Sequence, residues 1–123
     1  MLSGYHVLIV EDEAVVAQDL SDTIREAEGV VVGPCSGARE ARALLKGDPR
    51  VDAAVLDVNV SDGAITPILE ALRARRIPTL IYTGGALPED VRRRHPDLTV
   101  LSKPVRPVRL IAELRRITGK LLV

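Results

Sequence analysis

Five short apolar runs, separated by longer segments with helical spacing, constrain the fold of this chain more than any other feature. Most of the runs are continuously apolar, as expected for strands that are covered on both faces. The alternation of such strands with helices predicts an α/β domain with a parallel sheet and crossover helices. The runs are His6–Val10, Val30–Gly33, Ala53–Leu56, Thr79–Tyr82 and Thr99–Leu101.

Four of the intervening segments repeat apolar residues every three or four positions, as amphipathic helices do. Gly29 and Gly47 are suited to end the first two helices, and Pro107 is suited to begin the last. The apolar stripes are Val16-Leu20-Ile24-Ala27, Ala38-Ala41-Leu44-Leu45, Ile65-Ile68-Leu69-Leu72 and Leu110-Ile111-Leu114-Ile117.

The segment between Gly84 and Pro96 has a weaker pattern, with Val91 as its one strong apolar anchor. It predicts a short, poorly anchored helix or a mobile loop. Arg92-Arg93-Arg94 within it has no accompanying aromatic residue, which indicates a solvated face and not a nucleic-acid patch.

The composition is that of one globular domain, with 123 residues, 46% hydrophobic and 28% charged. Lys and Arg number 17, as do Asp and Glu, so no net field attracts nucleic acid or anionic lipid. The apolar stretches are too short to span a bilayer and no signal segment opens the chain, so we expect a cytoplasmic protein. The single cysteine, Cys35, excludes an internal disulfide and gives no metal-binding pattern.

Polar residues follow four of the predicted strands at the point where each one ends. These residues are Glu11-Asp12, Asp57, Thr83 and Lys103. Because the carboxyl ends of parallel strands meet at one edge of a sheet, we expect the five side chains to converge there. Such a set indicates a phosphorylation site.

The acidic residues of this set suit a magnesium ion. Adjacent carboxylates repel one another unless a cation is bound, and Mg²⁺ prefers oxygen ligands. Asp12 and Asp57 are the best direct ligands, the backbone carbonyl of Asn59 can complete the site, and Glu11 can hold a metal-bound water. The alternative is that Glu11-Asp12-Glu13 caps the first helix, where negative charge suits the helix dipole.

Asp57 can attack phosphorus to give an acyl phosphate, a known use of carboxylate nucleophiles. Phosphoryl transfer needs mainly positioning and charge neutralisation. Mg²⁺ would take one phosphoryl oxygen, Lys103 a second, and the Thr83 hydroxyl or a nearby backbone N–H a third. Taken singly, each residue has a simpler role: Lys103 as a solvated lysine, Thr83 as a strand residue, Asp57 as a helix cap.

From end to end, residues 1–123, the chain resembles the receiver domain of two-component response regulators, with no output domain in view. The resemblance implies a flavodoxin-like (βα)5 fold with helices on both faces of a sheet of order 2-1-3-4-5. It also implies Asp57 as phosphoacceptor, Mg²⁺ dependence, a sensor histidine kinase as donor and a cis peptide before Pro104. The motifs that carry it are Val10-Glu11-Asp12-Glu13, Val55-Leu56-Asp57, Tyr82-Thr83-Gly84 and Ser102-Lys103-Pro104.

Within that family, local motifs such as Leu56-Asp57-Val58-Asn59-Val60 resemble stand-alone alphaproteobacterial receivers, often linked to kinases of the HWE/HisKA2 class. A downstream protein target or a phosphotransfer protein is then expected, and a homodimer through the fourth helix is allowed. The implied kinase-binding surface is the first helix near Ala14, Val15, Ala17 and Gln18.

Two departures from the family pattern bear on how the signal would leave the site. The family's switch aromatic, three residues before the lysine, is Val100 here, and strand alternation points Tyr82 away from Thr83, so we expect Tyr82 to serve in packing. The loop after Asp57 lacks the family's frequent Met-Pro step.

Three other functions fit parts of the pattern. A phosphohydrolase with an aspartate nucleophile would need an acid/base aspartate two residues after Asp57, where this chain has Asn59. An interaction module that no longer takes phosphate would not need the complete residue set. Flavin binding has only the fold in its favour, since no aromatic stacking residues lie near the strand ends.

Overall fold

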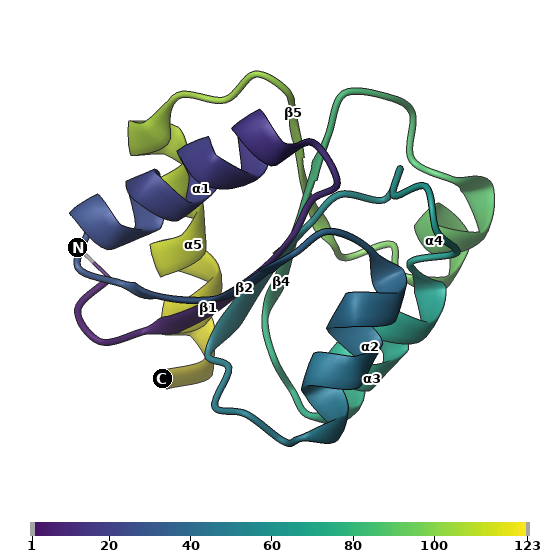
Figure 1. The fold of residues 1–123 in the computed structure, drawn as a ribbon, viewed down its shortest axis with the longest axis horizontal. Coiled ribbons are helices and arrows are strands. Elements are labelled where there is room, and N and C mark those ends of the chain that lie inside the picture. Colours follow the sequence, from purple (N-terminus) through teal and green to yellow (C-terminus); the bar gives the residue numbers. More distant parts are fainter. Residues whose placement is uncertain (1, 123) are drawn as a thin grey trace.

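The computed structural model describes residues 2–122 and the side chains of residues 2–119. The predicted alternation of strands and helices is confirmed, and the segment around Val91 forms a short helix (Figure 1). In chain order the elements are β1 (His6–Val10), α1 (Ala14–Glu26), β2 (Val30–Cys35), α2 (Ala38–Lys46), β3 (Ala53–Leu56), α3 (Thr66–Ala74), β4 (Thr79–Thr83), α4 (Glu89–Arg94), β5 (Thr99–Ser102) and α5 (Pro107–Leu122).

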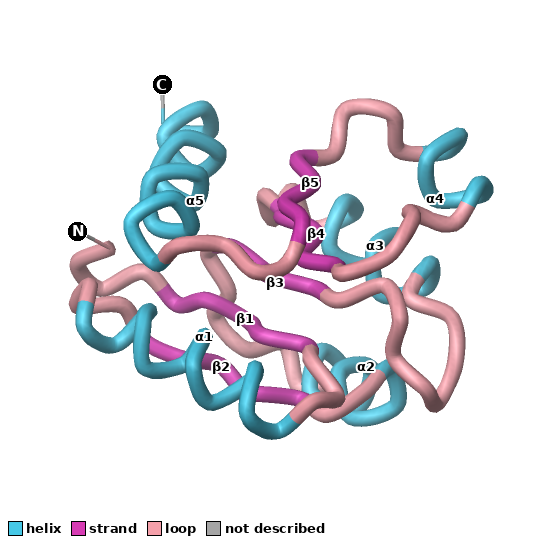
Figure 2. The backbone as a smooth tube through the Cα atoms, turned by 90° about the horizontal axis from the view of Figure 1, so that it is seen from above, coloured by secondary structure: helices cyan, strands magenta, loops and turns pink. Residues whose placement is uncertain are grey.

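The five strands form one parallel sheet of order β2-β1-β3-β4-β5, which confirms the expected topology (Figure 2). Three strands run further toward their carboxyl ends than the apolar runs indicated, reaching Cys35, Thr83 and Ser102. Thr83 pairs with Ser102 across β4 and β5, so polar side chains continue the ladder beyond the apolar residues. The cis peptide before Pro104 is confirmed, and a second one before Pro34 was not foreseen.

Each strand of the sheet's centre supplies side chains to two separate cores. Helices α2, α3 and α4 cover one face, and α1 and α5 cover the other (Figure 1). Along β1, Leu8 and Val10 belong to the first core, whereas Val7 and Ile9 belong to the second. The continuous apolar runs are therefore divided between the two faces by the two-residue period of a strand.

The helical stripes are confirmed to different extents. In α3 all of the predicted helical positions, Ile68, Leu69 and Leu72, are fully buried. In α2 only the small residues of the stripe are buried, while Leu44 and Leu45 stay partly exposed, because this helix packs beside the edge strand β2. None of the described helices has the length and apolar character needed to cross a membrane.

The loop after Asp57 caps helix α2, a role that the sequence did not suggest. The Asp62 carboxylate accepts hydrogen bonds from the backbone N–H groups of Ala38 (2.7 Å) and Arg39 (3.1 Å). A Cβ atom added at Gly37 would lie 2.4 Å from Asp62 Oδ1, so glycine is required for this close approach. The α2 N-terminus is thereby tied to the segment that follows β3.

Replacing Leu69 by alanine is expected to lower the free energy of unfolding by about 2–5 kcal/mol, because a fully buried side chain leaves a cavity. Urea denaturation measures the change. Val108→Ala is the matched control: Val108 is 82% exposed on α5, and its loss is expected to change stability by less than about 0.5 kcal/mol. Equal losses for the two variants would contradict the assigned core.

The Asp62 cap predicts a pH-dependent stability difference between the wild type and Asp62→Asn. Hydrogen bonds from Arg39 and Ala38 lower the pKa of Asp62 below its ordinary 3.8. A lowered carboxyl pKa stabilises the fold above pH 3.8, and this stabilisation is lost as the pH falls through the folded-state pKa. The wild type should melt at a higher temperature than Asp62→Asn near neutral pH, with a smaller difference in strong acid. A pH-independent difference would count against the charged cap.

Candidate functional site

Four neighbouring strands bring the predicted residues to one edge of the sheet. Glu11 follows β1, Asp57 follows β3, Thr83 ends β4 and Lys103 follows β5. The backbone hydrogen bonds of the sheet continue into this edge: the Asp57 N–H donates to the Val10 carbonyl (2.9 Å), and the Lys103 N–H donates to the Thr83 carbonyl (2.8 Å). The predicted convergence is therefore confirmed, and the sheet itself sets the positions.

The Lys103 ammonium links the carboxylates of this edge. Its Nζ donates to Asp57 Oδ2 (2.9 Å), to Glu11 Oε1 (2.5 Å) and more weakly to Glu13 Oε1 (3.5 Å). The Glu11 and Asp57 side chains are 1% and 5% exposed, so both carboxylates depend on this partner for charge compensation. Lys103 is thus not the solvated surface lysine of the simpler reading.

A second network joins the ends of β3 and β4. The Asn59 N–H donates to Asp57 Oδ1 (2.9 Å), and the Asn59 side-chain amide donates to Thr83 Oγ1 (2.8 Å). The Gly85 N–H also donates to Thr83 Oγ1 (3.2 Å). Asp57 therefore has a hydrogen-bond donor on each of its two oxygens. The Asn59 side chain connects the carboxylate loop to Thr83.

Burial and neighbouring charges shift the pKa values of Glu11 and Lys103. Burial raises the pKa of Glu11 to about 7, and the nearby Asp57 carboxylate adds to this rise while Lys103 opposes it. Burial lowers the pKa of Lys103, but its hydrogen bonds to Glu11 and Asp57 outweigh burial and leave that pKa above its ordinary value. Lys103 therefore stays charged, and the edge carries an excess of negative charge.

Three carboxylates of this edge can hold a cation. Glu11, Asp12 and Asp57 each offer an oxygen within 4.8 Å of the others, and Asp12 is the least buried. Hard carboxylate oxygens of this kind fit Mg²⁺. Ligation by the Asn59 carbonyl stays a prediction.

Glu13 lies at the start of α1, the position that the alternative, helix-capping interpretation gives it. It occupies the N-cap position of α1, but its side chain makes no capping hydrogen bond. Its carboxylate faces Lys103 instead, while its backbone N–H donates to Glu11 Oε2 (3.3 Å). The acidic run after β1 is therefore oriented toward the edge of the sheet.

Tyr82 is buried, whereas Val100 is exposed. Tyr82 is 8% exposed within the core under α1 and α5, which confirms its packing role. Lys103 Nζ also lies 5.6 Å from the centre of the Tyr82 ring, within cation–π range. Val100 is 41% exposed on β5.

Solved structures similar to this chain include receiver domains of signalling proteins. A response regulator receiver protein from Sinorhizobium medicae has a TM-score of 0.84 and 23% identity, over 97% of this chain and 98% of that one. The chemotaxis response regulator CheY4 of Vibrio cholerae has a TM-score of 0.77 and 26% identity, over 94% and 99%.

The receiver domain of a sensor histidine kinase from Pseudomonas aeruginosa has a TM-score of 0.77 and 24% identity, over 95% of this chain and 99% of that one. That structure holds a magnesium ion in its active-site cleft. No protein-family model and no curated protein matches the sequence. The structural similarity shows that the chain has the flavodoxin-like fold of CheY-like receiver domains.

Replacing Asp12 by asparagine is expected to weaken binding of Mg²⁺ by at least about tenfold, because one charged oxygen ligand is lost. Isothermal titration calorimetry measures the affinity. Glu13→Gln is the control, since this neighbouring carboxylate lies outside the three-carboxylate cluster. Equal affinities for Asp12→Asn and the wild type would place the cation elsewhere.

Proposed function

We propose that this protein is a phosphoacceptor receiver of a two-component signalling system, with Asp57 as the residue that takes the phosphoryl group. The observation that carries the proposal is the position of Asp57: a buried carboxylate, 2.9 Å from the Lys103 ammonium and linked through Asn59 to the Thr83 hydroxyl. Nucleophile, cation and hydroxyl come from adjacent strands of a receiver-type sheet. Phosphoryl transfer needs mainly such positioning.

In this mechanism an Asp57 carboxylate oxygen forms a bond to phosphorus while the bond between phosphorus and the donor breaks. The product is an acyl phosphate, and the donor leaves with the electron pair of the broken bond. Lys103, already beside Asp57 Oδ2, meets an oxygen of the phosphoryl group after the transfer.

The Thr83 hydroxyl can donate a hydrogen bond to the incoming phosphoryl group. Its Oγ1 accepts two hydrogen bonds, from Asn59 and Gly85, and within the described residues its own O–H has no acceptor. A hydroxyl can accept and donate at once, so Thr83 can donate to a phosphoryl oxygen. When it turns to do so, its bonds to Asn59 and Gly85 rearrange, which carries the change into the two loops.

A magnesium ion held by Glu11, Asp12 and Asp57 would neutralise charge on the transferring phosphoryl group. These carboxylates fit the ion by donor chemistry, and the kinase receiver domain from Pseudomonas aeruginosa holds magnesium in its cleft.

Helix α4 is the element suited to respond. Of its six residues Val91 is buried, and three polar side-chain contacts at the surface join the α4 region to α3: Asp90 with Thr66, Arg94 with Glu70, and Asp97 with Arg73. Surface contacts of this kind contribute little stability each.

His95, directly after α4, weakens the docking of this helix further. Its ring is 7% exposed, and neither ring nitrogen has a hydrogen-bond partner within the described residues. A buried polar group without a partner costs about 1–3 kcal/mol. An element with so few favourable contacts moves at low cost.

A sensor histidine kinase is the proposed donor. Of the four α1 residues expected at the kinase surface, Ala17 is buried and offers little surface to a partner. Ala14, Val15 and Gln18 are exposed, and Val15 is 74% exposed. The HWE/HisKA2 class, a downstream target or phosphotransfer protein, a homodimer and a cytoplasmic location stay proposals that rest on the sequence resemblance.

A phosphohydrolase is less well supported. Such an enzyme needs an acid/base group two residues after its nucleophile, and here the Asn59 amide is engaged with Thr83. An amide does not exchange protons as a carboxylate does. We therefore propose that the protein promotes only its own phosphorylation and dephosphorylation.

Asp57→Asn is expected to abolish phosphorylation by acetyl phosphate in the presence of Mg²⁺, because the nucleophilic oxygen is lost. Intact-protein mass spectrometry detects the added phosphoryl group. Asp62→Asn, a change of the same type in the same loop, is the control and should still be phosphorylated. Phosphorylation of Asp57→Asn, or steady turnover of p-nitrophenyl phosphate by the wild type, would refute the proposal.

A further inference from the structure

A cavity of about 500 Å³ lies between α1 and α5, beside the loop that joins β5 to α5. Its volume is in the range of small-molecule sites, which combine apolar walls with a few placed polar groups. Val16 and Leu20 line it from α1, and Val105 and Leu110 line it from the loop and α5. None of the four α1 residues expected at the kinase surface lines this cavity, so it is a separate feature of the same helix.

Tyr82 supplies a buried polar group to this cavity. The residue is 8% exposed and lines the cavity from β4, and its hydroxyl makes no hydrogen bond to any described residue. In the described part of the chain, the His95 ring nitrogens are the only fully enclosed side-chain nitrogen or oxygen atoms without a partner. The Tyr82 oxygen is therefore open to the cavity. Because a buried tyrosine hydroxyl usually has a hydrogen-bond partner, this one is available to a ligand.

The α1 side of the cavity is acidic. Asp19, Asp22 and Glu26 all line it, and their spacing of three and four residues places them along one side of the helix. Asp22 accepts a hydrogen bond from the neutral Gln18 amide (2.8 Å). Within the described residues, none of the three carboxylates is paired with a lysine or an arginine. The negative charge along this side of the cavity is therefore uncompensated.

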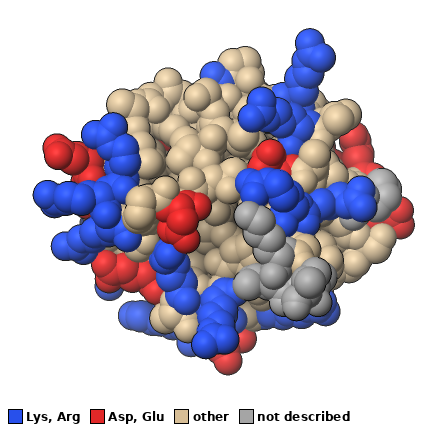
Figure 3. All heavy atoms as spheres, turned by 180° about the vertical axis from the view of Figure 1, so that it is seen from behind, with Lys and Arg blue, Asp and Glu red and all other residues tan. Residues whose placement is uncertain are grey.

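The charges around the cavity favour a positively charged ligand. Lys103 is the one cation among the residues that line it, and this ammonium is already held by Glu11 and Asp57. Figure 3 shows more basic than acidic side chains on the face seen from behind, although the whole chain has 17 of each. Charge is thus unevenly distributed over the molecule, and the cavity beside α1 is one of its acidic places.

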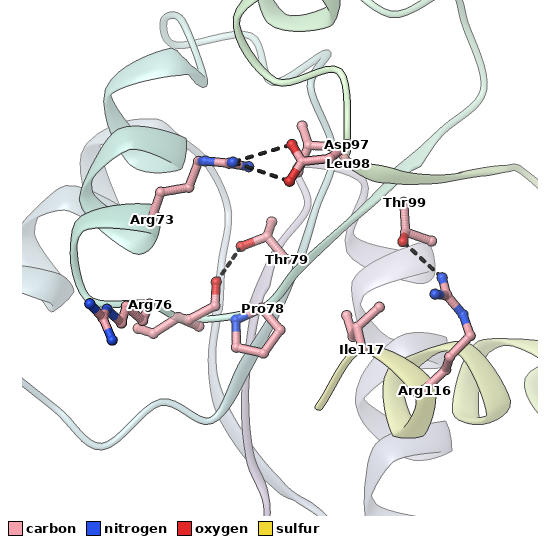
Figure 4. Close-up of a pocket in the computed structure, with 10 residues that line it drawn as sticks. Arg73, Arg76, Pro78, Thr79, Asp97, Leu98, Thr99, Arg116 and Ile117 are labelled. Atoms are coloured by element: carbon pink, nitrogen blue, oxygen red, sulfur yellow. Dashed lines mark hydrogen bonds and ion pairs between the residues drawn. The ribbon is translucent and has the colours of Figure 1, made fainter. Parts of the chain in front are cut away.

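A second cavity, at the starts of β4 and β5, differs in its polar groups (Figure 4). There Arg73 donates to both oxygens of Asp97 (3.2 and 3.3 Å), and Arg116 donates to the Thr99 hydroxyl (2.9 Å). The polar side chains that face this second cavity are therefore paired with one another. Of the two cavities, the one beside Tyr82 leaves a buried polar group for a ligand.

We propose that the cavity between α1 and α5 binds a small organic cation, an amine with an apolar body. Its ammonium group would lie between the Tyr82 hydroxyl and the acidic side of α1, and its body against Leu20, Val105 and Leu110. A phenol oxygen and a carboxylate both accept hydrogen bonds from an ammonium group. The bound amine would contact α1 and the loop after β5 together, and would thereby join them.

The test titrates phenethylamine, its neutral N-acetyl derivative and the anion phenylacetate into the full chain, followed by backbone amide chemical shifts. The amine should shift the amides of Leu20, Val105 and Leu110, and the other two compounds should bind at least about tenfold more weakly. Equal binding of the neutral derivative would overturn the proposal, because the charge would then have no role. Equal binding of spermidine would also overturn it, because the apolar walls would then have none.

The titration contains no Mg²⁺ and no phosphoryl donor, so its outcome is independent of the chemistry proposed for Asp57. A failure to bind the amine would refute the cavity proposal and leave the phosphoacceptor proposal standing.

Tyr82→Phe removes the hydroxyl and keeps the ring, so the core stays filled while the affinity for phenethylamine should fall by about tenfold. Tyr5→Phe is the matched control. Tyr5 is the other tyrosine of the chain, packs against the same core and does not line the cavity. Unchanged affinity in Tyr82→Phe, or an equal loss in Tyr5→Phe, would refute the site.

The acidic side of the cavity is tested by the double variant Asp19→Asn with Glu26→Gln. Both residues are exposed, so the fold should be kept, and the affinity for phenethylamine should fall by about fivefold. The control, Glu28→Gln with Glu89→Gln, removes the same net charge from residues outside the cavity. Equal losses in the two double variants would show only a general effect of charge and would contradict the proposal.

Discussion

The contact of Lys103 with two buried carboxylates is the interaction on which the carboxyl edge of this protein depends. Glu11 and Asp57 are buried at the ends of β1 and β3, where a carboxylate needs a charged or hydrogen-bonding partner. Lys103 supplies one positive charge from the end of β5. A buried ion pair of this kind is weak evidence for net stability. Its effect is to hold three strand ends in one arrangement.

The two hydrophobic cores fix the positions of these strand ends. Two separate cores, one on each face, anchor every central strand through alternating side chains. The strand ends therefore cannot shift relative to one another without disturbing both cores. Helix α4 lacks such support, with Val91 buried and His95 unpartnered. Rigid strand ends beside one loosely held helix are the combination that a phosphorylation switch requires, because local charge can then move one element and leave the sheet intact.

The path from the site to α4 differs from a ring-based one, because Val100 cannot act as a turning aromatic. The contacts that the structure offers run through Thr83 instead: its hydroxyl holds the Asn59 side chain and the Gly85 backbone, and Gly85 begins the connection to α4. The loop after β3 is tied in the other direction, through Asp62, to the start of α2. Each of these contacts joins segments that are more than twenty residues apart or crosses from strand to loop.

The sequence by itself determined the strands, the parallel sheet and the residues of the proposed phosphorylation site. Apolar runs ending in Asp57, Thr83 and Lys103 are local patterns, and parallel strands necessarily bring their ends together. Only the tertiary structure decided which side chains become partners. Lys103 meets Glu11 across 92 positions, and Asp62 caps a helix that precedes it. These contacts depend on how the helices pack on the sheet and on the lengths and conformations of individual side chains. A pattern in the sequence contains no information about either.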